Sequence, residues 1–446
     1  MPTSPTHARM SARHLIRGRR LWIVSTAAVG LLSFLLSLLY LGANSNPTGA
    51  MHDLPIAVVN DDQGAVHSGK RVNLGARITA QVTGAAQLKG KVAWKQVDRA
   101  GAKRLMDQDK AFGALVVPGN FSASVLGLAS HGKSLPARPT LDVLTNPAAG
   151  GFGSNMAEQV NREVAHNVSV ALGKELGRQM TQKAAKEKAA GKRVAAPSAP
   201  ERLLIADPVG VVVAQGHHLG DHSGFGLTSF FYTLVLVLAG MLGANVIHMQ
   251  IDTALGYAAK DLGPFRTAEP VRHLSRSRHF LVGCALMAGV SLLTSALTVV
   301  AAVEIVGIDA GHLLLLWIFG ACATMAMGCT ALALLAVLGT PGPLVSMLVL
   351  IGLAIPSAGA TIPLQAVPSS YDFLARFEPF RQVLDGIRSI LYFDAQLDAG
   401  LARGWAMTAA GLVISLLLGL GLTHLYDRRG LHRTAHLEAA GLSAAV

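Results

Sequence analysis

Residues 21–43 read LWIVSTAAVGLLSFLLSLLYLGA, an apolar run that contains no charged side chain. A helix needs about 20 apolar residues to cross the hydrocarbon core of a bilayer, so this run is long enough for one crossing. The apolar core of a cleaved signal peptide has only about 7–15 residues, and we therefore expect an uncleaved anchor.

Five further apolar segments follow a long polar stretch at 44–225. They lie at 226–248, 280–302, 313–339, 344–362 and 405–426. The pattern predicts a membrane protein, an all-α bundle of six transmembrane helices with an α/β or α+β external domain inserted between helices one and two. The segment 344–362 is the weakest, because prolines flank it and Pro356 interrupts it. A kinked or partly re-entrant helix is the alternative there.

Composition supports a membrane protein and indicates its orientation. Of the 446 residues 51% are hydrophobic and only 14% are charged, against about 25% charged in ordinary soluble domains. The net charge of +12 is concentrated in the N-terminal segment 1–20, the loop 249–279 and the tail 427–446. Basic flanks stay in the cytoplasm, so we expect a multi-pass protein of the cell inner (plasma) membrane with both termini cytoplasmic. Bases at span ends favour contact with membrane lipids and give no reason to expect a nucleic-acid partner.

The external segment predicts strands mixed with helices. Strands are expected at 54–59, 91–97, 111–117 and 141–144, with a turn at 60–64 and a short helix at 98–109. A long helix is expected at 155–188, with an apolar stripe that packs within the chain or in a dimer; the stripe consists of Met156, Val160, Val164, Val168 and Leu172. Residues 183–200 are basic and contain two prolines, which predicts a mobile stretch.

Several chemistries find no support in the residues, and we expect neither an enzyme nor a cofactor. The segment 84–91 resembles a phosphate-binding loop, but its spacing is one residue too long and no Ser or Thr follows Lys91. The three cysteines, Cys284, Cys322 and Cys329, lie in predicted spans, which excludes a disulfide or a thiol nucleophile in the external domain. Ionisable residues are confined to span edges, which argues against a proton-driven pump.

Two polar segments allow more than one interpretation. The cluster His217-His-Leu-Gly-Asp-His222 contains metal-binding residue types, but its spacing is irregular, and we interpret it as a polar collar where the chain enters the membrane. We assign no metal site. The amphipathic segment 369–394 lies in the outer membrane interface or packs over the spans.

Four stretches carry a resemblance to a known family. They are LPIAVVNDDQG at 54–64, AFGALVVPGNFS at 111–122, GFGLTSFF at 224–231, and the region from AIP at 354–356 through Pro363 to FEPF at 377–380 and RSILY at 388–392. Together with the order of one span, external domain and five spans, they are similar to type 2 ABC-transporter permeases, in particular to the phage-infection-protein branch.

This resemblance implies the permease subunit of an exporter for a hydrophobic or amphiphilic compound or a cell-envelope component. It implies a separate ABC ATPase subunit as a partner, a homodimer or heterodimer, and ATPase docking on the loop 249–279 through Arg272, Arg276 and Arg278. The alternative is a non-transporting envelope receptor, scaffold or secretion-system component that binds partners through the external domain.

Overall fold

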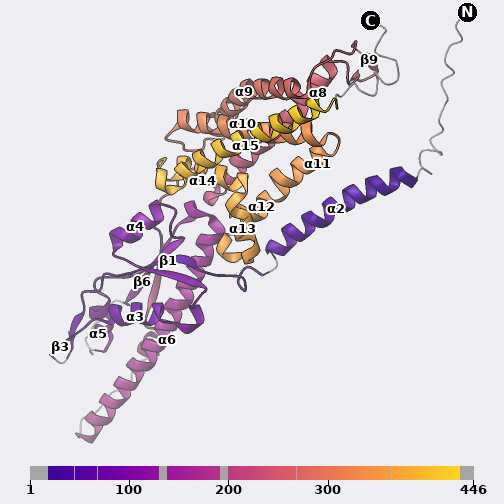
Figure 1. Ribbon diagram of the computed structural model, residues 1–446. Helices are drawn as coiled ribbons and strands as arrows, with labels where there is room; N and C mark the ends of the chain where they lie inside the picture. Colours follow the sequence, from indigo (N-terminus) through magenta and orange to yellow (C-terminus); the bar gives the residue numbers. More distant parts are fainter. Residues whose placement is uncertain are drawn as a thin grey trace, which may run out of the picture.

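The computed structural model describes residues 19–44, 46–67, 69–129, 138–190, 199–267, 269–359 and 361–431. The protein is elongated: long helices form one part, and a sheet with its covering helices forms the other (Figure 1). We refer to the sheet and its helices, residues 54–215, as the α/β unit. The far end is the end of the long helices that lies away from this unit, beside the small hairpin of β8 Lys260–Leu262 and β9 Phe265–Thr267.

Among the described residues, five helices are long and apolar enough to cross a membrane. They are α2 Arg19–Asn44, α8 Thr228–Ala254, α9 Arg276–Val300, α10 Leu313–Leu338 and α15 Leu401–Arg428. A π-helical turn, η4 Ala301–Ile305, continues α9. These helices fall at five of the six predicted spans, and the protein is accordingly a membrane protein.

Helix α10 is central to the helical part and packs against α8, α9 and α15. Small residues permit this close packing: a Cβ on Gly240 of α8 would lie only 2.7 Å from the carbonyl oxygen of Thr324 on α10. Close approach of this kind is the usual basis of helix association in lipid, where burial of apolar surface gives little drive.

The fifth predicted span, 344–362, is a broken segment instead of one long helix. It consists of α11 Gly342–Met347, the π-helical turn η5 Leu348–Gly352 and α12 Ala354–Ser357. A proline lacks an N–H group and its ring collides with the carbonyl four residues earlier, so Pro356 prevents a regular bond at Gly352, where the helix breaks. The kinked alternative describes this segment better than a continuous span does.

Helix α2 stands apart from the other long helices and meets the broken segment (Figure 1). The Tyr40 hydroxyl donates a hydrogen bond to the carbonyl oxygen of Ile351 at 3.3 Å, and Leu36 lies against Gly352. Other apolar side chains of this helix, such as Leu31, Phe34 and Leu41, are largely exposed. Such a surface is suited to lipid or to another protein chain.

The large sheet has the strand order β4-β1-β5-β6-β7. Its strands are β1 Leu54–Asn60, β4 Val92–Gln96, β5 Gly113–Val117, β6 Thr140–Thr145 and β7 Gly210–Gln215. Strand β1 is parallel to β4 and β5, β6 is antiparallel to β5, and β7 is parallel to β6. The four predicted strands are present, whereas β7 was not predicted.

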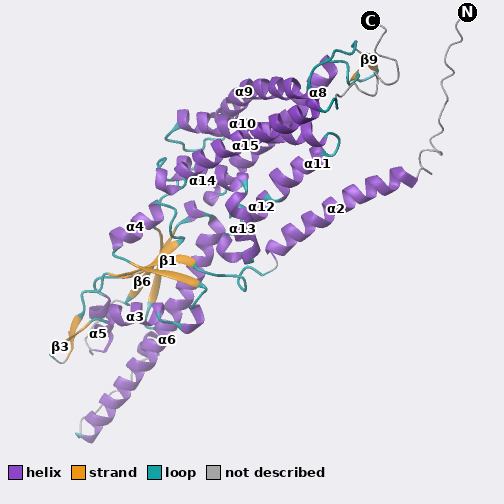
Figure 2. Ribbon diagram, in the orientation of Figure 1, coloured by secondary structure: helices purple, strands orange, loops and turns teal. Residues whose placement is uncertain are grey.

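Helices cover both faces of this sheet (Figure 2). They are α3 Leu74–Thr83, α5 Phe121–Ala129 and α6 Gly151–Ala189 on one face and α4 Arg99–Asp107 on the other, with α7 Ala199–Ala206 packed on α6. Strand β1 alternates between the two cores, with Leu54 and Ile56 facing α6 and Ala57 and Val59 facing α4. A short hairpin of β2 Ala65–His67 and β3 Lys70–Val72 follows β1.

Two of the predictions concern α6 and the chain after it. The stripe from Met156 to Leu172 packs against the sheet, which confirms packing within the chain. Of the predicted mobile stretch 183–200, residues 183–189 belong to α6, and 191–198 lie outside the described residues.

The amphipathic segment 369–394 forms two helices, α13 Ser369–Phe377 and α14 Pro379–Tyr392. Helix α14 packs against α8, α10 and α15, with Phe380, Leu384 and Ile387 fully buried. It therefore packs over the long helices, while its other side faces the α/β unit (Figure 1).

Candidate functional site

A cavity of about 300 Å³ lies where the α/β unit meets the helical part. Most of the lining of this junction cavity comes from the chain after α4, the chain at and just after the end of the broken segment, α14 and the start of α15. Pro55 of β1, Lys95 of β4 and Ala149 complete it. Its charged lining consists of the bases Lys95, Lys110, Arg381, Arg388 and Arg403 and the acids Asp109, Asp385 and Asp398. The bases outnumber the acids, so the lining favours a negatively charged or polar guest.

The ion pairs in this cavity are long. Arg388 Nη1 lies 3.5 Å from Asp109 Oδ2, Arg381 Nε lies 3.7 Å from Asp385 Oδ2, and Lys110 Nζ lies 3.5 Å from Asp398 Oδ2. Hydrogen bonds between charged groups are usually about 2.7–2.9 Å long, so these pairs are not fully closed. Arg388 is 5% exposed, and its Nε is buried with no hydrogen-bond partner among the described residues. A buried donor of this kind is costly unless a ligand or water satisfies it.

Burial has the largest effect on the pKa values of two acids, Asp109 and Glu378. It raises the pKa of Asp109 to about 7, against the opposing effect of the nearby Arg388 guanidinium. It also raises the pKa of Glu378 to about 7, although that carboxylate caps α14 by accepting hydrogen bonds from the N–H groups of Phe380 and Arg381 at 2.8 and 2.7 Å. Both carboxyl groups therefore titrate near neutral pH.

We expect Asp109→Asn to flatten part of the pH dependence of thermal stability. A raised pKa means that the folded state favours the protonated acid, so this contribution is complete below about pH 4 and is lost as the pH rises through about 7. Asp109 has a φ of 56°, which asparagine tolerates. The melting temperature of the wild type should fall between about pH 4 and 7. The melting temperature of the variant should fall less, with the remaining slope due to the raised pKa values of Glu378 and Asp385. An identical slope in both proteins would contradict the raised pKa of Asp109.

His217 connects the two parts beside the cavity. Its Nδ1 lies 2.8 Å from Asp107 Oδ1 on α4, and its Nε2 lies 2.7 Å from the carbonyl oxygen of Tyr392 at the end of α14. His218 and His222 are exposed. In the described chain the 217–222 cluster thus forms a connection and an exposed turn, and its side chains do not converge on one point.

The three predicted docking arginines lie at the far end, but they are not equivalent. Arg272 and Arg278 are exposed. Arg276 is half-buried: its Nε donates to the carbonyl oxygen of Leu431 at 2.7 Å, and its guanidinium lies 5.6 Å from the centre of the Tyr426 ring. Arg276 therefore ties α9 to the end of α15, and only the other two are available to a partner.

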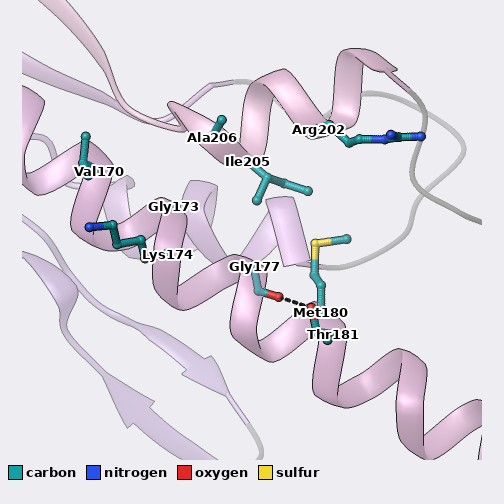
Figure 3. A pocket seen from close by; sticks show the side chains of 9 residues that line it. All are labelled: Val170, Gly173, Lys174, Gly177, Met180, Thr181, Arg202, Ile205 and Ala206. Carbon is teal, nitrogen blue, oxygen red and sulfur yellow. Dashed lines mark hydrogen bonds between the residues drawn. The ribbon is translucent and has the colours of Figure 1, made fainter.

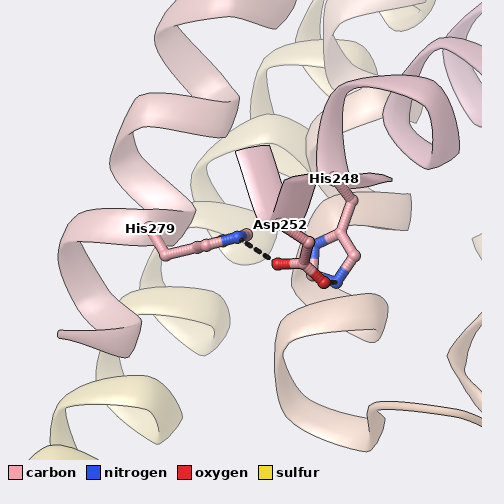
Figure 4. A group of neighbouring side chains, drawn as sticks. All are labelled: His248, Asp252 and His279. Atoms are coloured by element: carbon pink, nitrogen blue, oxygen red, sulfur yellow. Dashed lines mark hydrogen bonds and ion pairs between the residues drawn. The ribbon is translucent and has the colours of Figure 1, made fainter. Parts of the chain in front are cut away.

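A group of three ionisable side chains near these arginines was not predicted (Figure 4). His248 and Asp252 are one turn apart on α8, and His279 lies in the first turn of α9. His279 Nε2 lies 2.9 Å from Asp252 Oδ1, and His248 Nε2 lies 3.6 Å from Asp252 Oδ2. The sequence shows the spacing of His248 and Asp252 on one helix face, but only the fold brings His279 to them.

A second groove, of about 410 Å³, lies between α6 and α7 (Figure 3). Among the described residues that line it, Lys174 and Arg202 are charged. Close helix packing explains its position, because a Cβ on Gly173 would lie 2.5 Å from the carbonyl oxygen of Ile205. Its described lining contains no carboxylate or histidine that could pair with Lys174 or Thr181.

The fold and the junction cavity define a membrane protein in which long apolar helices support an α/β unit. The chain belongs to the family described as "Protein of unknown function (DUF3533)", which matches residues 24–411, from α2 into α15. No curated protein and no solved structure matches the chain.

Proposed function

We propose that this protein is the permease subunit of an ABC-type exporter. It moves a hydrophobic or amphiphilic compound or a cell-envelope component, and a separate ATPase subunit powers it. The observation that carries the proposal is the junction cavity, because a charged space open to polar groups lies directly against the apolar helical part. An amphiphile needs both environments at once.

The proposal includes six membrane crossings. The broken segment begins beside the far end of α10, where Gly342 touches Leu335, and the chain after it reaches the junction cavity at Ala358. It therefore takes the chain from one end of the helical part to the other, as a fifth crossing must. With six crossings, the start of α2 and the end of α15 lie on one side, and the α/β unit lies on the other.

The basic residues support a cytoplasmic far end. Arg19, the loop between α8 and α9, and Arg428 and Arg429 all lie at ends of long helices on that side. Basic flanks favour the cytoplasm, so the α/β unit faces outward in the inner (plasma) membrane. ATP is cytoplasmic, and the far end is accordingly the side on which an ATPase has to bind.

The α8–α9 loop is the proposed docking surface. It carries the β8–β9 hairpin, whose β9 strand is exposed, and it presents Arg272 and Arg278. It is also anchored, since the Arg272 N–H group donates to the carbonyl oxygen of Leu255 at 3.0 Å and Asp427 accepts from the Arg276 N–H group at 2.9 Å. A loop fixed at both ends can transmit a conformational change of a bound ATPase to α8 and α9.

The apolar surface of α2 supports the other proposed partners. Leu31, Phe34 and Leu41 are each more than half exposed along this helix. Lipid or a second subunit can cover such a face, and we propose a homodimer or heterodimer. The apolar part of the cargo would lie beside α2 and the broken segment, with its polar part in the junction cavity.

Capture of an ATPase from membranes tests the proposal. We expect the intact protein to capture an ABC ATPase. The double variant Arg272→Glu, Arg278→Glu should capture at least about tenfold less of it, because each charge reversal opposes a charged contact. The matched control is Lys183→Glu, Lys186→Glu, which makes the same charge change at the exposed end of α6. Arg276 is left intact because its side chain binds α15.

Two outcomes would count against the permease. If the intact protein captures no ATPase under gentle extraction, the alternative of an envelope receptor or scaffold takes its place. If both double variants lose the ATPase equally, the α8–α9 loop is not the docking surface.

A further inference from the structure

We propose that His248, Asp252 and His279 form a binding site for a divalent transition-metal ion, with zinc as the best-suited ion. The site would join the end of α8 to the start of α9 at the root of the α8–α9 loop. The inference is independent of the proposed function, because it rests on the side chains alone.

The donor set points to a transition metal. The two imidazole nitrogens are borderline donors and the carboxylate oxygen is a hard donor, a combination that suits Zn²⁺. Mg²⁺ and Ca²⁺, by contrast, prefer oxygen ligands. Three protein ligands leave a fourth position for water, as in zinc sites that exchange a ligand.

The distances also fit. Zinc binds nitrogen and oxygen at about 2.0–2.2 Å, so neighbouring ligand atoms of a tetrahedral site lie about 3.3 Å apart. The two separations from the Asp252 oxygens, 2.9 Å to His279 Nε2 and 3.6 Å to His248 Nε2, lie on either side of this value. All three ligand atoms lie within 4.8 Å of one another. The two separations that involve Asp252 therefore differ from this value by only a few tenths of an ångström, and side-chain rotations that bring all three ligand atoms from within 4.8 Å to about 3.3 Å of one another would admit the ion.

Rigid elements hold the ligands. Figure 4 shows the three side chains pointing toward one another from two helices. The start of α9 is fixed by Ser275, whose hydroxyl caps the helix, and by Ser277, whose hydroxyl donates to Asp427 at 2.8 Å. The His279 and Asp252 side chains are 5% and 13% exposed, so the site is largely screened from solvent. Ligands on helices are positioned more accurately than ligands on loops.

A metal here would have a structural consequence. Residues 255–275 connect α8 to α9, and both ends of this connection lie close in sequence to the proposed ligands Asp252 and His279. A bound ion would hold the two ends together more firmly than the hydrogen bond between His279 and Asp252 does. Loss of the ion would loosen the root of the loop.

Metal binding to the full chain tests this directly. The protein is purified in detergent without a polyhistidine tag, stripped with a chelator and titrated with Zn²⁺ by calorimetry. We expect one ion per chain. His248→Ala and His279→Ala should each weaken binding by more than about a hundredfold, because loss of a residue that only hydrogen-bonds to a metal ligand already costs about 10–100-fold.

Two further variants separate binding from folding. Asp252→Asn keeps the shape and an oxygen that can accept from His279, but it removes the negative charge that zinc prefers, so it should fold and bind weakly. The double variant His218→Ala, His222→Ala removes two exposed histidines elsewhere and should leave the titration unchanged.

The wild-type protein provides a test that needs no variant. Co²⁺ should give the visible absorption of a tetrahedral site with nitrogen and oxygen ligands, and Zn²⁺ should abolish it by competition. Bound Zn²⁺ should also protect His248 and His279, among the 16 histidines of the chain, from pyrocarbonate modification mapped by peptide mass. If the stripped wild type binds no Zn²⁺, or if these two histidines are not protected, the group is a hydrogen-bonded clamp and the proposal fails.

Discussion

We expect Asp62→Ala to unfold the α/β unit. The Asp62 side chain is buried, and its carboxylate accepts hydrogen bonds from the N–H groups of Gly75 at 2.9 Å, Ser122 at 3.0 Å and Gly64 at 3.2 Å, and from the Ser122 hydroxyl. Burial alone would raise its pKa, but the bonds from Ser122, Gly75 and Gly64 outweigh burial and lower it. One carboxylate thus holds together the turn after β1, the start of α3 and the start of α5.

The expected loss is large because alanine would leave three backbone donors without an acceptor. The donors of Gly75 and Ser122 are buried, and each unsatisfied buried donor costs about 1–3 kcal/mol, so these two alone cost about 2–6 kcal/mol. A whole domain is stable by only about 5–15 kcal/mol. Limited proteolysis of the purified protein should therefore show the α/β unit cut rapidly in the variant, while the helical part stays resistant.

The neighbouring residue provides a matched control. Asp61 is partly exposed and forms an ion pair with the exposed Arg99 at 2.7 Å. Surface ion pairs of this kind contribute about 0–1 kcal/mol, so Asp61→Ala should leave the proteolysis pattern close to that of the wild type. Equal resistance of the two variants would show that the Asp62 hydrogen bonds do not hold the unit together.

Asp62 also illustrates what sequence reasoning reached in the α/β unit and what it missed. The apolar run 54–59 predicts β1, and the following polar residues predict a turn. The sequence gives no sign that Asp62 serves two helices as well as its own turn, because Ser122 is 60 residues away. Strand β7 was not predicted for a similar reason. It is largely exposed, and it pairs with β6 only because the chain returns to the sheet after α6 and α7.

The same limit applies to the candidate sites. The sequence predicts α14 from its apolar stripe, and it shows Arg381, Asp385 and Arg388 on the polar side of that stripe. It does not show that Asp109 lies beside Arg388, since 279 residues separate them. Hydropathy likewise predicts spans at 226–248 and 280–302, which fall on α8 and α9 but miss the end of α8 by six residues and the start of α9 by four. It does not show that His279 meets Asp252. Periodicity predicts elements, whereas the contacts that make a site depend on how distant elements pack.

The second large effect is expected from Gly386→Leu in α14. A Cβ at this position would lie 2.3 Å from Phe319 Cζ on α10, and Gly404 of α15 packs against the same place. Such overlap forces side chains or backbone to shift, at a cost of about 3 kcal/mol, the upper part of the usual range for an over-packed core. The melting temperature in detergent should fall clearly, and Phe319→Ala in the same chain should restore part of it.

This substitution also bears on the junction cavity, because α14 supplies Arg381, Asp385 and Arg388 to its lining. If α14 shifts away from α10, these side chains move toward the α/β unit, and the cavity changes shape without the loss of a charge. Gly411→Leu on α15 is the control, since a Cβ there meets no atom within 4 Å. If the Gly386→Leu protein is stable but no longer transports the proposed cargo, the loss is due to the position of α14. If it melts and transports like the control, the contact with Phe319 does not hold α14 in place.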